Sequence, residues 1–585
     1  MPDKISFLGK LYGQYRSQLS AWLRFHMLEV EPLTKKVIEN FQHKGIVNGW
    51  LVSLPDHESK LYVLIDYEFP YSQIHIALCG ESRYLEWPHV EEHGYLCLPS
   101  NNWLPIENLD DSINNCIYNA LELINSCQSS EFIELESKRE FLSYWGRSSK
   151  TKSIGLSILD LKNTETRLVT CKKTANYWLF GESDETVETW LNNCGIKGNN
   201  DTFQAIFGFV DEAPALPFPL GSKRFIRTLW TQCSNIEKIA SQLSPHKEIY
   251  VVLAIRNENG IGLIGGRLSA IPPDGFSEGR LLFFKYIKWL LAHISRFDSF
   301  RVKRADSDWS HGRANDPYHS RLAGSKILVV GAGSLGSQVA SRLAQAGVGS
   351  IEIIDPEMLE PNNIGRHTLG MESVLFNKAH GLAAHLSKNY PHSKFVPIPE
   401  SWEHQISKIE KDLSDCDLIV RCVAEPSNDF MWDDWFRSRQ INTPTVYGWL
   451  GTHGTTGNAL ALTYESPGLS CYFEAEGFLR KADTDFEGDT QVKTEPGCGT
   501  EFQPYGPLTV GKVELLVTRL CVDILVGKTA APEHRVYACA TEDIHDLGGK
   551  WTPEHLQYRP NGYDGPFEYK KTVDFCGKCY SCKAQ

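Results

Sequence analysis

The sequence predicts a multidomain protein of the α/β and α+β classes. The chain has 585 residues, enough for about four domains of about 150 residues each. A strand–glycine turn–helix–strand pattern lies between residues 327 and 355, and antiparallel strand-like runs lie between two helical segments near the N-terminus. We therefore expect an N-terminal α+β domain over 1–130, a mixed α/β domain over 131–305 and a C-terminal domain with a parallel sheet over 306–585.

The C-terminal pattern has the layout of a nucleotide-binding unit. The β-branched run Ile327–Val330 suits a buried parallel strand, and a helical pattern follows its glycine turn. A second apolar strand, Ile351–Ile354, ends in Asp355, which can accept a hydrogen bond from a ribose hydroxyl. Glycines let the backbone approach phosphates, and the helix N-terminus favours their negative charge. The glycines of the turn are Gly331, Gly333 and Gly336.

Three polar side chains beyond the ribose acid indicate a triphosphate. Asn363, Arg366 and Lys378 suit a ligand whose charge exceeds what one helix dipole neutralises. With these residues the segment resembles the ThiF/MoeB-like adenylating family, which includes the ubiquitin-activating enzymes. The resemblance implies a Rossmann-type domain that binds ATP and adenylates a protein C-terminal glycine, with Arg366 and Lys378 taking part. The alternative is a nucleotide fold with incidental surface charges.

Two further site residues follow from this resemblance. The family has an arginine upstream of the glycine turn that reaches ATP, often the ATP of the partner subunit in a dimer. Arg313 is the first choice for it and Arg304 the second, although either residue suits a solvated surface charge equally well. The family's magnesium-binding aspartate is replaced by Ala424. Glu425 is adjacent and offers the hard oxygen ligand that magnesium requires.

The N-terminal region carries a cysteine in a patterned loop. A helix is expected to about residue 30, then strands over 45–54, 60–67 and 73–78, and a helix over 109–127. With its segment from Pro88 to Pro105, this order resembles a ubiquitin-conjugating domain.

The resemblance makes Cys97 a nucleophile that carries an acyl group as a thioester. His89 stands where the family has an asparagine that supports attack on the thioester, and an imidazole can donate a hydrogen bond or act as a base there. Trp87 replaces the family's histidine. An inactive conjugating-like fold with a buried Cys97 is the alternative.

The middle region, residues 131–305, contains no motif that indicates a particular reaction. Strand-like runs lie at 155–159, 250–255 and 262–270, and helices are expected at 186–193 and 278–294. The family resemblance suggests a linker or an inactive adenylation-like domain.

A second candidate nucleophile lies in the acidic, glycine- and threonine-rich stretch from Cys471 to Tyr505, which we expect to be a long mobile crossing loop. Cys498 precedes a helix through Val513 and Leu516, and the adenylating family has its catalytic cysteine at this point. A nearby helix N-terminus lowers the pKa of a thiol and favours the thiolate. A loop cysteine without a role is the alternative.

Cysteines at two-residue spacing end the chain and suggest a structural zinc site. Cys576, Cys579 and Cys582 supply three soft ligands, and zinc takes four. Cys471 lies where zinc-bearing members of the family have another cysteine pair, although Glu474 replaces the second cysteine of that pair. A redox-active or unpaired tail is the alternative.

Composition excludes several classes of function. The net charge of −13 argues against broad binding to nucleic acid or anionic membranes. No apolar run is long enough to span a bilayer, and no secretion signal is visible. Most of the 16 cysteines stand singly in apolar settings, which indicates a reducing cytoplasm.

Together these features resemble the bacterial activating–conjugating fusion family of type II CBASS anti-phage operons. The resemblance implies a homodimer that uses ATP and Mg²⁺ to adenylate a C-terminal-glycine protein, expected to be a cGAS/DncV-like nucleotidyltransferase. The acyl group would pass through Cys498 and Cys97 to an amine on an acceptor protein or small molecule. A sulfur-carrier adenylating enzyme and a non-catalytic scaffold are the rivals. An NAD-linked oxidoreductase is disfavoured because no hydride-transfer partner is visible.

Overall fold

The computed structural model forms two compact units, one of residues 1–187 and 199–304 and the other of residues 188–198 and 305–585. Each is considered by itself. The structure describes residues 2–55, 60–100, 103–148, 154–198, 201–213, 216, 227–228, 231–240, 242, 249–258, 260–268, 297–313, 316–406, 413–423, 425–474, 479–486, 493–494, 501–502, 504–579 and 582.

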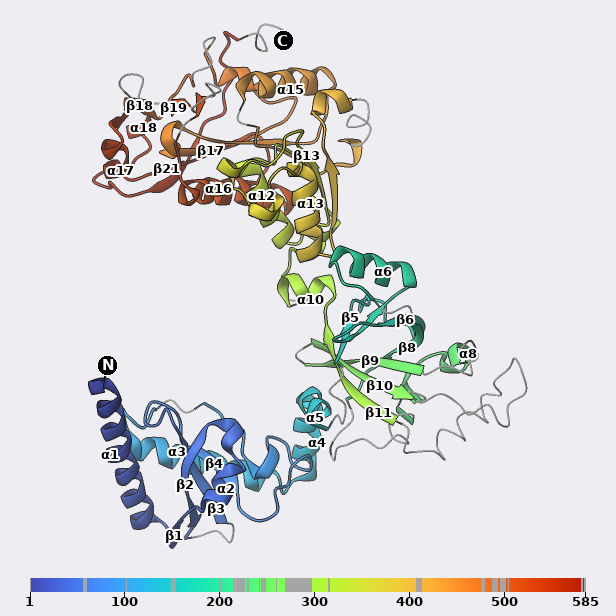
Figure 1. Ribbon diagram of the computed structural model, residues 1–585, viewed down its shortest axis with the longest axis vertical. Coiled ribbons are helices and arrows are strands. Elements are labelled where there is room, and N and C mark those ends of the chain that lie inside the picture. Colours follow the sequence, from blue (N-terminus) through green and yellow to red (C-terminus); the bar gives the residue numbers. More distant parts are fainter. Residues whose placement is uncertain are drawn as a thin grey trace. The chain divides into compact units, whose positions relative to one another are not determined.

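The first unit begins with an α+β fold, as the sequence predicts. Helix α1 (Pro2–His26) and helix α3 (Leu109–Ser126) accompany an antiparallel meander in the order β1-β2-β3-β4 (Figure 1). Leu19 and Leu23 of α1 are fully buried with Ile113 of α3 in one core. The strands are β1 (Glu29–Pro32), β2 (Ile46–Ser53), β3 (Lys60–Asp66) and β4 (His75–Leu78), with short helices α2 (Lys35–Glu39), η1 (Gln42–Lys44) and η2 (Glu92–Gly94).

Two helices then lead into a closed seven-stranded barrel, where the sequence predicted only a mixed α/β region. Helix α5 packs on the barrel: Trp145 Nε1 donates to the Phe300 carbonyl at 2.9 Å. The strand order is β10-β11-β5-β7-β6-β8-β9. The predicted helix over 278–294 lies outside the described residues. The elements are α4 (Ser130–Arg139), α5 (Phe141–Ser148), β5 (Ile154–Ser157), β6 (Arg167–Lys173), β7 (Trp178–Gly181), α6 (Asp184–Asn193), β8 (Thr202–Val210), α8 (Ile236–Ala240), β9 (Ile249–Asn257), β10 (Gly260–Leu268) and β11 (Phe297–Arg304).

The second unit is built on an eight-stranded sheet in the order β14-β13-β12-β15-β16-β17-β21-β23. The first five strands in this order pair in parallel, and the last three pair antiparallel. These strands are β12 (Lys326–Val330), β13 (Ser350–Ile354), β14 (Lys394–Ile398), β15 (Leu418–Arg421), β16 (Thr445–Leu450), β17 (Thr456–Leu462), β21 (Glu533–Ala538) and β23 (Phe567–Lys571). A parallel core of this kind confirms the predicted Rossmann-type architecture.

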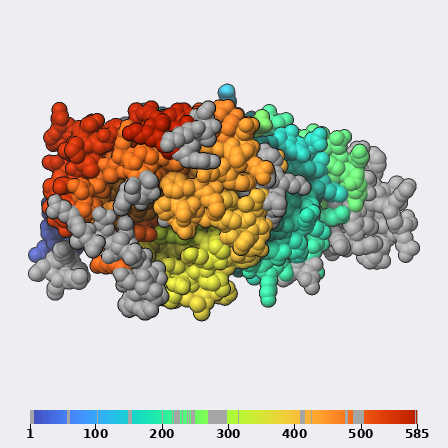
Figure 2. Space-filling model, turned by 90° about the horizontal axis from the view of Figure 1, so that it is seen from above, coloured from blue at the N-terminus to red at the C-terminus, as the bar shows by residue number. Residues whose placement is uncertain are grey.

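Helices cover both faces of this sheet. Val339 of α12 and Val517 of α16 are fully buried in one core, and Trp432 of α15 is fully buried in the other. The segment between β13 and α13, yellow in Figure 2, forms part of the molecular surface. The helices are α10 (Ser307–Gly312), α11 (His319–Gly324), α12 (Ser334–Gln345), α13 (Lys378–Asn389), α15 (Pro426–Ser438), α16 (Pro507–Leu525), α17 (Thr541–Asp546) and α18 (Pro553–Leu556). Short 3-10 helices are η4 (Pro361–Asn363), η5 (Met371–Ser373), η6 (Trp402–Gln405), η7 (Leu413–Asp415), η8 (Thr452–Gly454) and η9 (Leu469–Cys471).

The segment from Cys471 to Tyr505 differs from the irregular loop that the sequence predicted. It contains β18 (Thr484–Phe486), which pairs antiparallel with β22 (Gly549–Trp551), and a second short pair, β19 (Lys493–Thr494) with β20 (Glu501–Phe502). Phe486 packs with Trp551 in a small core of its own, which explains why this part of the segment is ordered as a strand.

A buried ion pair holds the same segment against the end of the chain. Asp483 is 3% exposed, and Lys571 donates to it at 2.7 Å. Tyr569 donates a further hydrogen bond, and His555 lies 3.5 Å away. Because breaking a buried pair strands the remaining charge, this network fixes the start of β18. Within the described residues, no helix combines the length and the apolar character needed to cross a membrane.

Candidate active sites and metal centre

The protein backbone requires glycine at two of the three glycine positions in the turn between β12 and α12. Gly331 has φ +90°, and a Cβ there would lie 2.8 Å from the Cys422 carbonyl oxygen on the neighbouring strand end. A Cβ on Gly336 would lie 1.8 Å from the Gly331 carbonyl oxygen, so this glycine permits close packing of helix on strand. A Cβ on Gly333 would meet no atom within 4 Å. The backbone at Gly333 therefore borders open space at the start of α12, where phosphates fit.

Asp355 ends β13 and braces this turn. It is 6% exposed, and its carboxylate accepts from the Ala332 N–H at 2.7 Å and from the Glu357 N–H at 2.8 Å. Burial raises the pKa of Asp355. His367 closes the turn from the other side, because its Nε2 lies 2.7 Å from the Ala332 carbonyl oxygen and its Nδ1 accepts from a backbone N–H. The sequence did not mark His367 as a site residue.

The predicted phosphate ligands lie around the same turn. Lys378 is 6% exposed at the start of α13, and its ammonium donates to Glu357, two residues beyond Asp355. The Arg366 carbonyl accepts from Gln338 Nε2 of α12 at 2.8 Å. Asn363 ends η4, where its side-chain oxygen accepts from the Glu360 N–H at 3.1 Å. The structure thus gathers the glycines, Asp355, Arg366 and Lys378 at the carboxyl ends of β12 and β13, where this fold binds nucleotides.

Arg313 and Glu425 are exposed at the ends of helices. Arg313 follows α10 with φ +52°, the left-handed region. Glu425 precedes α15 and accepts from the Ser427 hydroxyl at 3.3 Å. It lies three residues beyond Cys422, whose carbonyl contacts the glycine turn, so its carboxylate is on the same edge of the sheet. Ala424 lies outside the described residues.

Cys498 also lies outside the described residues, but the end of its segment reaches the nucleotide edge. The Tyr505 hydroxyl is 3.3 Å from the Ser334 hydroxyl at the first residue of α12. The Arg366 guanidinium lies over the Tyr505 ring, 4.7 Å from its centroid. Tyr505 therefore connects the part of the chain that follows Cys498 with the glycine turn. It also connects that part with Arg366, a predicted ATP ligand.

Cys97 and His89 line one surface pocket of about 420 Å³ in the first unit. Cys97 is exposed, and its N–H donates to the His89 carbonyl at 2.8 Å. This backbone bond, next to a bridge between Val90 and Leu96, fixes the two residues beside each other. Burial raises the pKa of the Cys97 thiol, and Glu91 and Glu140 act in the same direction.

Two glutamates that the sequence did not reveal flank the His89 ring. Glu136 Oε2 lies 3.1 Å from Nε2, and Glu140 Oε1 lies 3.3 Å from Nδ1. Glu140 and, to a lesser degree, Glu136 raise the pKa of His89, against the opposing effect of burial. Glu136 lies on α4 and Glu140 is the residue that follows its end, so their spacing of four puts both carboxylates on the same side of the helix. That spacing was the only signal in the sequence, and it is common on solvated helices.

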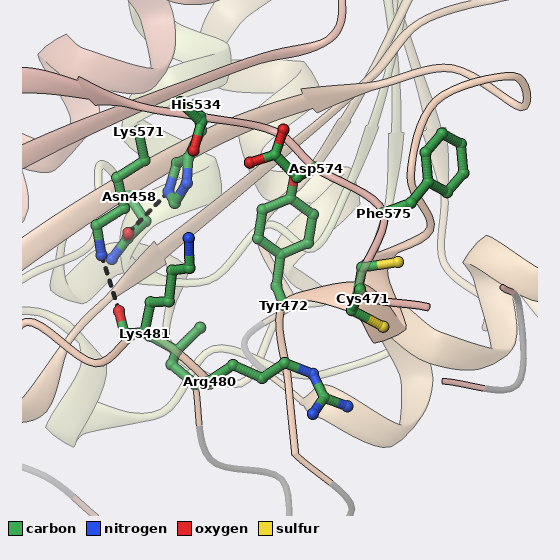
Figure 3. Close-up of a pocket in the computed structure, with 12 residues that line it drawn as sticks. Asn458, Cys471, Tyr472, Arg480, Lys481, His534, Lys571, Asp574 and Phe575 are labelled. Carbon is green, nitrogen blue, oxygen red and sulfur yellow. Dashed lines mark hydrogen bonds between the residues drawn. The ribbon is translucent and has the colours of Figure 1, made fainter. Parts of the chain in front are cut away.

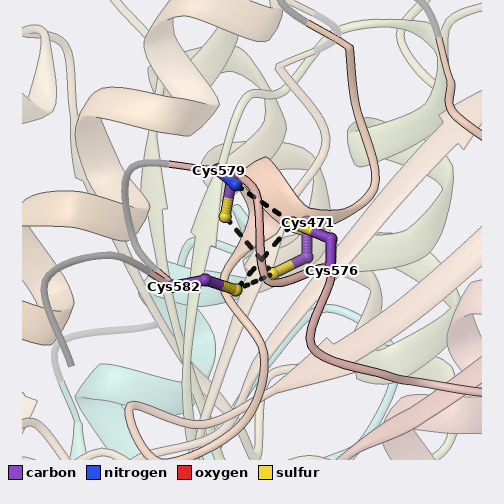
Figure 4. Close-up of side chains that lie close together, drawn as sticks. All are labelled: Cys471, Cys576, Cys579 and Cys582. Carbon is purple, nitrogen blue, oxygen red and sulfur yellow. Dashed lines mark hydrogen bonds between the residues drawn. The ribbon is translucent and has the colours of Figure 1, made fainter.

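Four cysteines converge in the second unit (Figure 4). Cys471 Sγ lies 3.5 Å from Cys579 Sγ and 3.4 Å from Cys582 Sγ, and Cys576 Sγ lies 3.8 Å from Cys582 Sγ. A tetrahedral Zn–S₄ site with bonds of about 2.3 Å has edges of about 3.8 Å, so the donor set fits zinc. Glu474, the residue that replaces the family's second cysteine, forms an ion pair with Arg480. The pKa of Cys576 is lowered to about 6; burial opposes this, and hydrogen bonds from the Lys578 and Cys579 N–H groups cause it.

Two cavities lie beside these sites. One of about 180 Å³ adjoins Cys471 and is lined by His534, Asn458 and Lys571 among others (Figure 3). His534 is fully buried, and burial lowers its pKa to about 3, so its ring is neutral. A larger cavity of about 470 Å³ lies past the carboxyl end of β16, between the start of α15 and β18. Its walls combine aromatic side chains, among them Phe430, Trp449 and Phe473, with carboxylates such as Asp429 and Asp485.

Two parts of the chain match known protein families. Residues 311–543 match the ThiF family, and residues 23–154 match prokaryotic E2 family B. The chain carries a ThiF-family domain joined to a prokaryotic E2-family domain. The predicted fold classes of both domains are confirmed. The glycine turn, Asp355 and Lys378 lie in the ThiF-family domain, and Cys97, His89 and the two flanking glutamates lie in the E2-family domain.

Bacterial proteins are among the relatives of this chain. The ATP-dependent ubiquitin transferase-like protein Cap2 of Pseudomonas aeruginosa is 31% identical over 163 residues, which are 27% of this chain and 28% of that protein. Cap2 of Enterobacter hormaechei is 33% identical over 121 residues, 21% of this chain and 20% of that protein. The matches thus span less than a third of these relatives. A crystal structure of MccB from E. coli with MccA-N7isoASN has a TM-score of 0.32 at 16% identity and covers 45% of this chain and 68% of that one.

Proposed function

We propose that this protein activates the C-terminal carboxylate of another protein with ATP and conjugates it to an amine. The observation that carries the proposal is the presence, in one chain, of a glycine turn at the carboxyl edge of a parallel sheet and of a pocket with an exposed cysteine. The carboxyl edge of a Rossmann-type sheet is by itself compatible with many reactions. An exposed thiol is by itself compatible with few. The two together fit an acyl group that is first activated and then carried as a thioester.

The first reaction takes place at the ThiF-family domain. The Gly333 backbone and the N-terminus of α12 receive the phosphates, and Asp355 accepts from the ribose. Lys378 and Arg366 neutralise the triphosphate charge, and Glu425 supplies an oxygen ligand for Mg²⁺. The carboxylate oxygen of the bound protein attacks the α-phosphorus, an O–P bond forms and pyrophosphate leaves.

Two cysteines then carry the acyl group. The Cys498 thiolate attacks the acyl-adenylate carbonyl and releases AMP, and the Cys97 thiolate attacks the resulting thioester and releases Cys498. An acceptor amine finally attacks the thioester on Cys97, which forms an amide and frees the thiolate. Each attack exchanges one activated acyl bond for another, so no step has to condense an amine directly with a carboxylate. The exposure of Cys97 supports its role as the last carrier.

The aromatic cavity of about 470 Å³ is suited to the tail of the activated protein. It lies past β16, at the carboxyl edge of the sheet that holds the nucleotide site, and an extended chain end needs such a channel. We propose a cGAS/DncV-like nucleotidyltransferase with a C-terminal glycine as that protein, and an anti-phage role. The acceptor would be a lysine of a protein or a small amine. The sequence similarity to the ATP-dependent ubiquitin transferase-like protein Cap2 supports conjugation, and the choice of the nucleotidyltransferase follows from the family resemblance.

We also propose a homodimer, with Arg313 reaching the ATP of the partner subunit. Four large apolar side chains are exposed between β13 and α13, in the yellow segment of Figure 2, with exposed fractions between 52% and 73%. Such a group of apolar residues commonly marks a contact surface between proteins. They are Met358, Met371, Leu375 and Phe376.

Zinc fits the four cysteines and would serve the structure rather than the reaction. When bound, the metal would tie the chain end at Cys576, Cys579 and Cys582 to Cys471, which begins the crossing segment. All four ligands are sulfur, so no open position is left for a substrate or a water.

Exchange of labelled pyrophosphate into ATP tests the first reaction. The purified chain is mixed with ATP, Mg²⁺ and a nucleotidyltransferase that ends in glycine, and the same protein without its last residue is the control. Exchange that requires the terminal glycine supports the proposal. Exchange absent with every glycine-ended protein tried, from a chain that binds ATP, would favour a scaffold.

A further inference from the structure

The residues that flank His89 come from a segment that the sequence assigned to the middle region. Helices α4 and α5 follow α3 at the end of the E2-family match and pack on the barrel. Tyr144 of α5 is fully buried in a core that also contains Val251 and Leu253 of the barrel. Its hydroxyl accepts from the His89 N–H at 3.0 Å and donates to Glu140 at 2.7 Å. The backbone and the side chain of His89 are thus both held by this segment.

His89 is held at both ring nitrogens. With one carboxylate on Nδ1 and another on Nε2, both nitrogens have to donate, which only the imidazolium does. Glu136 is itself fixed by Arg139, which also pairs with Glu258 of the barrel. The left-handed backbone of His89, with φ +58°, turns this residue toward α4 and still lets its carbonyl accept from the Cys97 N–H. Strained backbone of this kind persists when its surroundings hold it in place.

We propose that Glu136 and Glu140 are positioning residues of the conjugating site, which hold His89 as an imidazolium beside Cys97. The α4–α5 segment, which also packs on the barrel, then completes the site. This inference rests on the proposed function, because it assigns His89 a task in the transfer of an acyl group from Cys97.

The positive charge on His89 acts in the transfer of the acyl group from Cys97 to the amine. The amine nitrogen forms a bond to the thioester carbonyl carbon, and the carbon–sulfur bond breaks with its electron pair left on Cys97 Sγ. The proton lost by the amine goes to water. Negative charge develops first on the carbonyl oxygen and then on the sulfur, and a fixed cation next to both lowers the barrier. In the free protein, burial, Glu91 and Glu140 raise the pKa of the Cys97 thiol, whereas Arg147 and Lys44 lower it.

The pH dependence has a definite sign. The folded pKa of His89 is raised above its ordinary value, with Glu140 the largest cause, so the imidazolium persists to higher pH than in a free histidine. The titratable groups that contact His89 are Glu136 and Glu140 at its ring and Tyr144 at its backbone N–H. Cys97 and Glu122 of α3 line the same pocket. The contribution of protonated His89 to folding stability is complete below the pKa that this residue has in the unfolded chain. It is lost as pH rises through the pKa of His89 in the folded protein. Removing the glutamates shifts that loss to lower pH.

The test uses the full chain and a chemical acyl donor, so it needs neither ATP nor the natural substrate. A Cys498→Ala protein is charged by exchange with the 2-mercaptoethanesulfonate thioester of N-acetylglycine. Peptide mass mapping then follows loss of the acyl group from Cys97 to free lysine, between about pH 6 and about pH 9, which spans the ordinary histidine pKa. The Glu136→Gln/Glu140→Gln double variant is compared with Glu134→Gln. Glu134 is on the same helix and pairs with Lys138, so this control makes the same change away from His89.

The proposal predicts that the double variant discharges about tenfold more slowly near neutral pH, because a smaller fraction of His89 is then present as the imidazolium. In a His89→Asn background the same two substitutions should change the rate less than about twofold, and Glu134→Gln should change nothing. Equal slowing in both backgrounds would mean that the glutamates only support the fold. An unchanged rate for the double variant in the background that retains His89 would also overturn the proposal. Failure of ATP-dependent activation would leave this result untouched, so the two proposals fail separately.

Discussion

Alanine at Gly333 should separate nucleotide binding from folding. The backbone at Gly333 has φ −74°, which alanine adopts freely, and its Cβ would meet no atom within 4 Å. Alanine at Gly331 is the opposite case, because φ is +90° and the Cβ would lie 2.8 Å from the Cys422 carbonyl oxygen. The same added methyl group would therefore project into open space at Gly333 and into the neighbouring backbone at Gly331.

The expected magnitudes follow from these contacts. Gly333→Ala should change the free energy of unfolding by less than about 1 kcal/mol, since the weaker helix cap and the stiffer unfolded chain offset each other. If phosphates occupy the space, the methyl group overpacks the site by about 1–3 kcal/mol, which weakens ATP binding about 5- to 150-fold. Gly331→Ala should cost about 2 kcal/mol or more from its left-handed backbone and the clash, and should lower Tm by about 4–8 °C.

Calorimetric titration with ATP and thermal unfolding measure the two effects on the same samples. Gly13→Ala, in open space on α1 of the other unit, is the control and should leave ATP affinity unchanged. A Gly333→Ala protein that binds ATP as the wild type does would refute the placement of phosphates at this turn. A Gly331→Ala protein with an unchanged Tm would refute the argument from backbone geometry.

Three further substitutions test separate parts of the structure. Asp355→Asn leaves one of two backbone N–H donors unpaired, so ATP-free protein should lose about 1–3 kcal/mol of stability by urea unfolding, and pyrophosphate exchange should fall. Cys471→Ser should reduce bound zinc from one equivalent to none by elemental analysis, whereas zinc retained in full would place the metal elsewhere. Asp483→Asn strands Lys571 and should cost about 3–5 kcal/mol. Although burial opposes it, the partners of Asp483 keep its folded pKa below the ordinary value, so its contribution should hold at neutral pH and be lost as pH falls through that pKa.

The sequence was most informative where local pattern and tertiary structure have the same cause. The strand Ile327–Val330, the glycine turn and Asp355 are adjacent in sequence and in space, so their arrangement could be predicted directly. The helix that begins at Lys378 and the cysteine loop at Cys97 were predicted on similar grounds. The roles of these residues in catalysis and binding stay predictions.

Other features depend on contacts between distant residues. Glu136 and Glu140 lie about 50 residues from His89 in sequence, and nothing in their local pattern distinguishes them from a solvated helix face. The β18–β22 pair, which joins Thr484 to Trp551, arises because Phe486 finds a small apolar core at that distance. Closure of the barrel is also a non-local property, since it pairs β11 with β5.

The relay itself is tested most directly by intact mass and non-reducing gels of the wild type, Cys97→Ala and Cys498→Ala proteins, each with ATP, Mg²⁺ and a glycine-ended nucleotidyltransferase. The account predicts a thiol-sensitive adduct on Cys97 in the wild type that fails to form in Cys498→Ala, and an adduct held on Cys498 in Cys97→Ala. An adduct on Cys97 that forms equally well without Cys498 would contradict the two-cysteine relay.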